Sequence, residues 1–155
     1  HAHFNRAITR SEIGEIQGAM EDLDRAIELS PDFHLAYYQR GWLLATNHQH
    51  KYAIADYQRA IELKPDYLDA YYQRGCSHQN LGNLSAAVAD FSRAIEIDPR
   101  YAPAYYQRGK VHAQIGDGTG AIRDYHQAAN LYLDRGDSKT YQQILAILDR
   151  LVGRG

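Results

Sequence analysis

Histidine, cysteine and carboxylate side chains are the groups of this chain that could bind a metal or act in catalysis. The eight histidines include His48 and His50 in a polar stretch that we expect to be a loop, and His78 and His112, which lie at i and i+34. His-x3-His and Cys-x2-Cys spacings allow two side chains to bind one metal ion. Neither spacing occurs in this sequence. The single cysteine, Cys76, has no activating base nearby in its repeat. Since no phosphate-binding loop or Gly-x-Ser-x-Gly motif is present either, we predict no metal, no cofactor and no enzymatic activity.

Arginine and aspartate recur as pairs in which the aspartate always lies at i+16 from the arginine. The pairs are Arg6 with Asp22, Arg40 with Asp56, Arg74 with Asp90, and Arg108 with Asp124. Four repetitions favour an ion pair that joins two helices, within one repeated unit or between units. The alternative is a row of arginines that binds an acidic partner, and it is weaker because each arginine has a carboxylate at hand.

These pairs belong to a longer repeat. The string Ala-Tyr-Tyr-Gln-Arg-Gly begins at Ala36, Ala70 and Ala104, so it recurs at i, i+34 and i+68, and prolines recur with the same spacing at 31, 65 and 99. The sequence therefore predicts a divergent first unit at residues 1–33, further units at 34–67, 68–101 and 102–135, and a tail at 136–155.

Each unit predicts two helices. In the second unit, Tyr37, Gly41 and Leu44 lie at i, i+4 and i+7, which is one face of a helix. A polar stretch follows, and then a second helix that ends before Pro65, because the residue before a proline is pushed out of the helical region. Glycine inside a helix costs about 1 kcal/mol of propensity. We therefore expect Gly41 to allow close helix contact, facing small residues such as Ala53 and Ala60.

A 34-residue helix–turn–helix period is typical of one repeat family, and the chain resembles the tetratricopeptide repeat family. The residues that carry the resemblance in the second unit are Tyr37, Gly41, Ala53, Tyr57, Ala60 and Pro65, and the third unit has Tyr71, Gly75, Ala87, Phe91, Ala94 and Pro99. The Tyr-Tyr-Gln-Arg-Gly string is similar to that of repeat proteins common in cyanobacteria, which suggests a bacterial type. The resemblance implies an all-α fold, a right-handed superhelical solenoid of four helix pairs with a C-terminal capping helix.

The tail predicts that capping helix. The fourth unit has Leu133 in place of the proline, so its second helix can continue to a stop at Gly136. We expect Ser138 to cap a last helix with an apolar stripe that includes Tyr141, Ile144 and Leu148. Solenoids need such a helix to cover the apolar face of the final repeat.

A second stripe lies one residue beyond the packing stripe. The resemblance implies that the first helix of each pair lines a concave surface, where Phe4, Tyr38, Tyr72 and Tyr106 would form an aromatic ladder. Tyrosine and tryptophan are enriched at binding hot spots, and the variable Trp42 suits specificity. The alternative is that the tyrosines only pack between repeats. The predicted partner-binding groove comprises Phe4, Ile8, Tyr38, Trp42, Asp69, Tyr72, Cys76, Gln79, Asn80, Tyr106, Lys110 and Gln114.

The sequence therefore favours a scaffold or adaptor that binds a protein or peptide partner in this groove. Some tetratricopeptide domains hold the C-terminal carboxylate of chaperones with a Lys and an Asn, but Phe4 and Ile8 occupy those positions here. The alternatives are a homo-oligomeric assembly module, suggested by His3 and Arg10 at positions where apolar residues are expected, and an interaction domain cut from a larger protein.

The composition of the chain limits the classes of partner and the compartments that fit it. The formal net charge is −2 with scattered Lys and Arg, which argues against nucleic acid. No apolar run approaches the roughly 20 residues of a membrane span, so we predict no membrane insertion. One cysteine leaves the compartment undetermined, with the cytoplasm favoured. The chain begins at His1, so it can be a fragment of a longer one.

Overall fold

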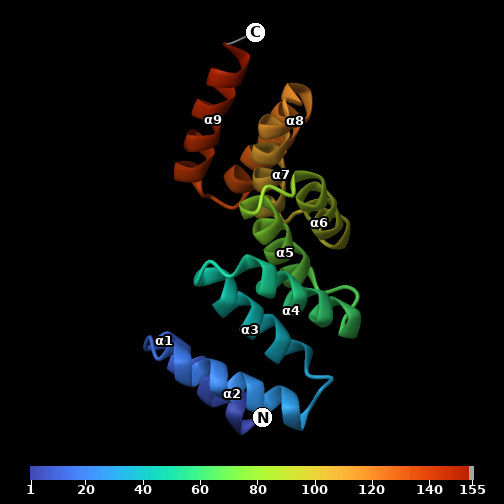
Figure 1. The fold of residues 1–155 in the computed structure, drawn as a ribbon. Helices are drawn as coiled ribbons and strands as arrows, with labels where there is room; N and C mark the ends of the chain where they lie inside the picture. The colour runs from blue at the N-terminus through green and yellow to red at the C-terminus, as the bar shows by residue number, and fades with distance from the viewer. Residues whose placement is uncertain (154–155) are drawn as a thin grey trace. The chain divides into compact units, whose positions relative to one another are not determined.

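The computed structural model describes residues 1–153, which form nine α-helices and no strand (Figure 1). The prediction of an all-α fold is confirmed for this part of the chain. The helices are α1 (Ala2–Glu12), α2 (Ile16–Leu29), α3 (His34–Thr46), α4 (His50–Leu63), α5 (Leu68–Asn80), α6 (Leu84–Ile97), α7 (Ala102–Ile115), α8 (Gly118–Asp134) and α9 (Ser138–Val152). The chain divides into two compact units, with α1 to α5 in unit 1 (residues 1–81) and α6 to α9 in unit 2 (from residue 82 onward).

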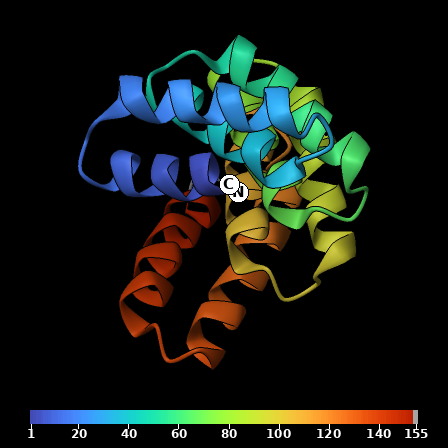
Figure 2. The same ribbon diagram turned by 90° about the horizontal axis from the view of Figure 1, so that it is seen from below.

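Unit 1 is built from helical hairpins. Helix α1 packs on α2, and α3 packs on α4; Figure 2 shows α1 and α2 as the two arms of one hairpin. Their shared core is made largely of alanines, among them Ala7, Ala19 and Ala36, with Leu23 and Leu43 as its large members. Small side chains let helices approach closely, so this composition suits a fold in which the backbones lie near one another.

In each predicted repeat, one residue between the two helices has a left-handed backbone. The residues there are Gly14 (φ 85°), His48 (φ 62°), Gly82 (φ 79°) and Gly116 (φ 95°), each one repeat period from the next. Glycine adopts this conformation without steric cost, whereas a side chain with a Cβ does so with strain. His48 is therefore the exception in this series. The next predicted loop residue, His50, is instead the first residue of α4.

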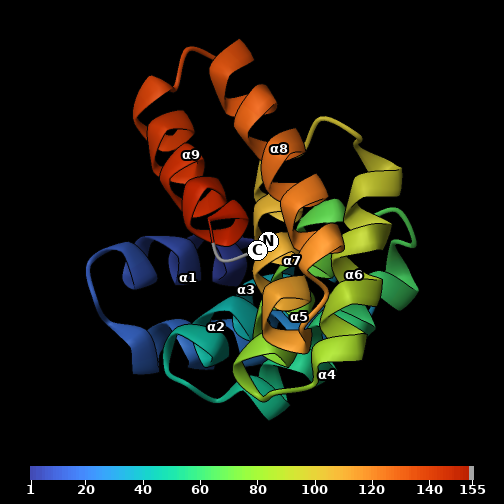
Figure 3. The same ribbon diagram turned by 90° about the horizontal axis from the view of Figure 1, so that it is seen from above.

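Unit 2 ends in the predicted capping helix. Helix α8 ends at Asp134, and Gly136 adopts φ 80°, which confirms the predicted stop. Helix α9 then packs back on α8 (Figure 3), burying Ile144 and Leu148 against Tyr125 and Ala128. The prediction that Ser138 caps α9 is wrong. The cap is Asp137, whose carboxylate accepts a hydrogen bond from the Thr140 backbone N–H at 3.1 Å.

The predicted helix-to-helix ion pairs are confirmed in three of the four repeats. Arg6 Nε lies 2.9 Å from Asp22 Oδ2, Arg40 Nε lies 2.8 Å from Asp56 Oδ2, and Arg108 Nε lies 2.8 Å from Asp124 Oδ2. In each case a second guanidinium nitrogen binds the other carboxylate oxygen, which is the bidentate geometry that orients an arginine firmly. The fourth pair, Arg74 with Asp90, has one member in each unit and stays a prediction.

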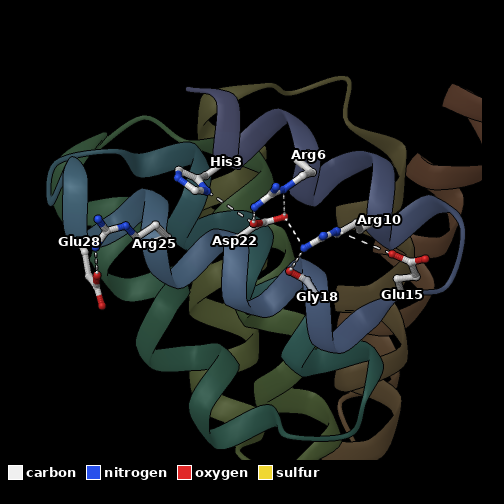
Figure 4. A network of polar contacts seen from close by, with 8 residues as sticks. All are labelled: His3, Arg6, Arg10, Glu15, Gly18, Asp22, Arg25 and Glu28. Carbon is white, nitrogen blue, oxygen red and sulfur yellow. Dashed lines mark hydrogen bonds and ion pairs between the residues drawn. The ribbon is translucent and has the colours of Figure 1, made fainter.

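Three side chains of α1 contact Asp22. Figure 4 shows His3, Arg6 and Arg10 of α1 converging on this aspartate of α2. Arg10 Nη1 lies 3.0 Å from Asp22 Oδ2, and His3 Nδ1 lies 3.5 Å from Oδ1. The hydrogen bond from Arg6 lowers the pKa of Asp22 to about 2, against the opposing effect of burial. His3 and Arg10 thus contribute to the α1–α2 contact, and this accounts locally for two polar residues at positions where apolar ones were expected.

Gly41 does allow close approach of two helices, but the predicted partners are wrong. A Cβ built on Gly41 would lie 2.9 Å from Tyr57 Cε1 and 3.2 Å from Asp56 Cβ, rather than against Ala53 or Ala60. Tyr57 is fully buried. The glycine therefore makes room for a large ring, and the same ring supports the residues described next.

Candidate functional site

The two tyrosines of the Tyr-Tyr string have different roles in the structure. In two of the three pairs the first tyrosine fixes the preceding loop: the Tyr37 hydroxyl donates to the Pro31 carbonyl at 3.2 Å, and the Tyr105 hydroxyl donates to the Pro99 carbonyl at 2.9 Å. Arg40 lies 5.7 Å from the centre of the Tyr37 ring, a cation–π contact on the side of the ion pair. Tyr37 and Tyr105 are therefore structural, and the second tyrosines remain the candidates for binding.

Three of the predicted groove residues line one pocket of unit 1. The pocket measures about 350 Å³, and its walls come from α1 and α3. Its lining residues are Ile8, Ser11, Glu12, Tyr38, Gln39 and Trp42. This volume is near the lower end of the range of ligand pockets, roughly 300 to 1,000 Å³. We call this cavity the α1–α3 pocket.

Trp42 is the residue of this pocket that most needs explaining. It is 40% exposed, although a tryptophan gains more from burial than most residues. Its position one turn after Tyr38 on α3 places both aromatic side chains along one edge of the pocket. An exposed tryptophan beside an apolar cavity is typical of a residue that is buried by a partner.

Two buried tyrosine rings pack against Tyr38. Its ring centre lies 5.8 Å from that of Tyr57 and 5.2 Å from that of Tyr67, and both of those rings are buried. Burial raises the pKa of the Tyr57 hydroxyl, which has no hydrogen-bond partner among the described residues. Because these rings cannot move freely, the pocket wall is formed before any partner arrives, and a preformed wall lowers the entropic cost of binding.

The polar rim of the pocket carries one charge. Glu12 is the only charged lining residue, it is exposed, and within residues 1–153 it forms no ion pair. The Ser11 hydroxyl is already used, because it donates to the Ile8 carbonyl at 2.7 Å. Ser11, Glu12 and Gln39 are not among the groove residues predicted from the sequence. For Ser11 and Glu12 the helical spacing is an indication in the sequence, because Ile8, Ser11 and Glu12 lie at i, i+3 and i+4 on one helix face.

The other predicted residues of unit 1 lie outside this pocket. Phe4 is half-buried and packs on Phe33, with ring centres 4.9 Å apart. On α5, Tyr72, Cys76 and Gln79 are half-buried, whereas Asp69 and Asn80 are exposed. Asn80 donates a hydrogen bond to the Cys76 carbonyl at 2.9 Å, so its amide serves the last turn of its own helix. The aromatic ladder that would include Phe4 and Tyr72 stays a prediction.

Unit 2 holds the remaining three predicted residues on α7. Tyr106 packs on Tyr125, with ring centres 5.8 Å apart, and Lys110 Nζ lies 5.8 Å from the centre of the Tyr106 ring. Gln114 is exposed near the end of the helix. Tyr106 in this unit thus resembles Tyr38 in unit 1, since the ring of each packs against a buried tyrosine of the second helix.

Two of the histidines make local polar contacts. His50 Nδ1 lies 3.1 Å from Ser77 Oγ, and His112 lies 3.3 Å from an Asp117 carboxylate oxygen. Within residues 1–153, no cluster of three His, Cys, Asp or Glu side chains has the arrangement of a metal site. A search of the same residues for a helix with the length and hydropathy of a membrane span also finds none.

Comparisons with known proteins agree on one fold. A tetratricopeptide repeat model matches residues 1–33, and a TPR repeat model matches residues 49–82 and 80–116, so the matches together cover more than half of the chain. No curated protein matches the sequence.

Solved structures match over most of the chain. One is the crystal structure of MamA protein, with a TM-score of 0.80 at 18% identity over 97% of this chain and 90% of that one. Another is the first TPR of Spaghetti (RPAP3) bound to the HSP90 peptide SRMEEVD, with a TM-score of 0.73 at 19% identity over 74% of this chain and 91% of that one. At such identities the likeness concerns the fold. Together with the family matches, it shows that the chain belongs to the tetratricopeptide repeat family.

Proposed function

We propose that this protein binds a segment of a partner protein in its predicted concave groove, and that the α1–α3 pocket holds the anchoring side chain of that segment. The tetratricopeptide repeat is a protein-interaction fold, whose stacked helices offer an extended binding surface. The observation that carries the proposal is the 40% exposure of Trp42 at the edge of a preformed apolar pocket.

The chemistry of the pocket suggests which segments fit. Ile8, Tyr38 and Trp42 supply apolar and aromatic surface, so the anchor is an aliphatic or aromatic side chain. Glu12 adds an unpaired negative charge at the rim. A Lys or Arg next to the anchor would pair with Glu12, and its cation could also lie over the face of Trp42.

A structural neighbour supports the general mode and differs in detail. The TPR of Spaghetti (RPAP3) was solved with the HSP90 peptide SRMEEVD, which is an acidic segment. Among residues 1–153, the lining of the α1–α3 pocket includes one carboxylate and no cation. We therefore expect this acidic peptide to leave the emission of Trp42 unchanged, whereas a segment with a cation beside an apolar anchor shifts it.

The proposal is tested by capture from a lysate of the source organism with three proteins. These are the wild type, the Trp42→Ala variant, and the Tyr52→Ala variant as a matched control. Tyr52 is an aromatic residue of α4 that is 67% exposed and does not line the pocket. Loss of a hot-spot aromatic residue costs about 2 kcal/mol or more, which is a roughly thirtyfold weaker affinity.

The expected result is a partner that wild type and Tyr52→Ala retain and that Trp42→Ala loses, and whose purified form shifts Trp42 emission. Equal retention by all three proteins would contradict the proposal. Capture of the chain itself, with a mass by light scattering that grows with concentration, would favour the assembly-module alternative instead.

A further inference from the structure

A second pocket, of about 200 Å³, lies within unit 2. It is lined by Ala113 of α7, Tyr125 of α8, and Ile147, Arg150 and Leu151 of α9. None of these five residues belongs to the groove predicted from the sequence. Three of them come from the capping helix, so α9 supplies more than a cover for the last repeat. We call this cavity the α7–α9 pocket.

Tyr125 is one of the two polar residues that line this pocket. Tyr125 is 4% exposed, and the structure gives its hydroxyl no hydrogen-bond partner among residues 1–153. Burial raises the pKa of Tyr125 to about 12, and the positive charge of Arg150 partly opposes this rise. The hydroxyl is thus protonated at neutral pH, and it is available as a donor to whatever occupies the pocket.

The hydroxyl is not needed for packing. Counting back one repeat period at a time, the equivalent positions hold Phe91, Tyr57 and Leu23, and all three side chains are buried. Phenylalanine or leucine therefore fills the same place between helices. What distinguishes Tyr125 is its position beside an open cavity and near a cation.

Arg150 provides a positive charge in the wall of the α7–α9 pocket. It is exposed, and within residues 1–153 it forms no ion pair. Among residues 1–153 it is the only charged residue that lines the pocket, and the side chains of Ala113, Ile147 and Leu151 are aliphatic. A guanidinium beside a phenolic hydroxyl offers two kinds of donor to one carboxylate.

We propose that the α7–α9 pocket binds an internal segment of a partner protein in which a Glu or Asp adjoins an aliphatic side chain. The carboxylate accepts hydrogen bonds from Arg150 and from the Tyr125 hydroxyl, and the aliphatic side chain enters the cavity against Ile147 and Leu151. The volume favours this occupant, since about 200 Å³ is below the roughly 300 Å³ at which pockets for whole small molecules begin. This site does not depend on the α1–α3 pocket.

The test uses three synthetic probes and backbone NMR of the labelled protein. The first probe is the blocked peptide acetyl-Gly-Ser-Ala-Leu-Glu-Ala-Leu-Ser-Gly-amide. The second replaces its Glu with Gln, and the third carries the Gln and a free C-terminal carboxylate. We expect the first probe to shift the amide signals of Ala113, Ile147 and Leu151, and to leave the indole signal of Trp42 in place. The Gln probe should bind about tenfold more weakly, because a hydrogen bond to a charged group is lost.

Variants assign the binding to named groups. Arg150→Gln should weaken the Glu probe about tenfold and leave the Gln probe unchanged. Tyr125→Phe should weaken the Glu probe by about threefold to tenfold, with the fold preserved as Phe91 implies. The matched control is Arg123→Gln on α8, which removes a charge that does not line the pocket.

Each other outcome overturns the proposal. Equal binding of the Glu and Gln probes would remove the role of the carboxylate. An equal effect of Arg123→Gln and Arg150→Gln would show general charge attraction only. Binding of the third probe alone would assign the pocket to a chain terminus, and the absence of shifts with any probe would show that the cavity binds no such segment. Circular dichroism establishes that each variant is folded.

Discussion

Two equivalent glycines should respond differently to the same substitution. Gly41 and Gly109 occupy matching positions on α3 and α7, two repeat periods apart in the chain. A Cβ on Gly41 would lie 2.9 and 3.0 Å from two ring atoms of Tyr57, whereas a Cβ on Gly109 would lie 3.3 and 3.4 Å from the corresponding atoms of Tyr125. The first distance requires a shift of the ring, and the second requires only a slight adjustment.

The magnitudes follow from two opposing effects. Replacing glycine by alanine inside a helix gains about 1 kcal/mol of propensity. Overpacking a well-filled core costs about 1 to 3 kcal/mol. Tyr57 is fully buried and packs against Tyr38, so its ring has little room to shift. Gly41→Ala should therefore lower the free energy of unfolding by up to about 2 kcal/mol. Tyr125 borders the α7–α9 pocket and has room to move, so Gly109→Ala should be neutral or raise it by up to about 1 kcal/mol.

The assay is thermal unfolding of the wild type and both variants, followed by circular dichroism. For a chain of this size, 1 kcal/mol corresponds to a shift of about 2 to 4 °C in Tm. We expect a lower Tm for Gly41→Ala and an unchanged or higher Tm for Gly109→Ala. If Gly41→Ala raised the Tm as much as Gly109→Ala did, the close contact between Gly41 and the Tyr57 ring would be refuted.

Three further predictions concern the turns, the ion pairs and the last helix. His48→Gly should raise the free energy of unfolding by up to about 1 kcal/mol because it relieves a left-handed backbone, and Gly14→Ala at the matching turn should lower it, as thermal melts will show. The pKa of Asp22 in the folded protein is about 2, below its ordinary 3.8, so its stabilising effect is present above pH 3.8 and is lost as the pH falls toward 2; Asp22→Asn should remove this part of the acid sensitivity of Tm. Asp137→Ala should cost about 1 kcal/mol by removing the cap of α9, whereas Ser138→Ala should change urea unfolding little.

Much of the fold could be predicted from the sequence because the 34-residue period repeats its evidence. The Arg–Asp pairs occur four times at one separation, and three are found as bidentate contacts. The stop of α8 at Gly136 was predictable because glycine alone adopts its φ of 80° freely. Such features depend on local chemistry or on simple spacing, which a sequence displays directly.

The errors concern contacts that depend on three-dimensional detail. Gly41 was expected to face alanines, but the neighbour is Tyr57, since the residue that fills the space depends on how the two helices are rotated. Asp137 rather than Ser138 caps α9, because the cap is set by where the chain enters the helix, and both residue types are good caps. The α7–α9 pocket is not predictable from the sequence pattern, because it needs side chains from three helices.

The most direct test of the proposed function places a photo-crosslinking amino acid at single positions of the protein in its own lysate. Position 39 replaces Gln39, which lines the α1–α3 pocket and leaves Trp42 in place, and position 52 replaces the exposed Tyr52 of α4 as the control. Our account predicts one partner protein attached to position 39, absent from position 52, and displaced by an excess of unmodified wild-type protein. Crosslinks of equal yield at both positions, or at position 52 alone, would contradict it.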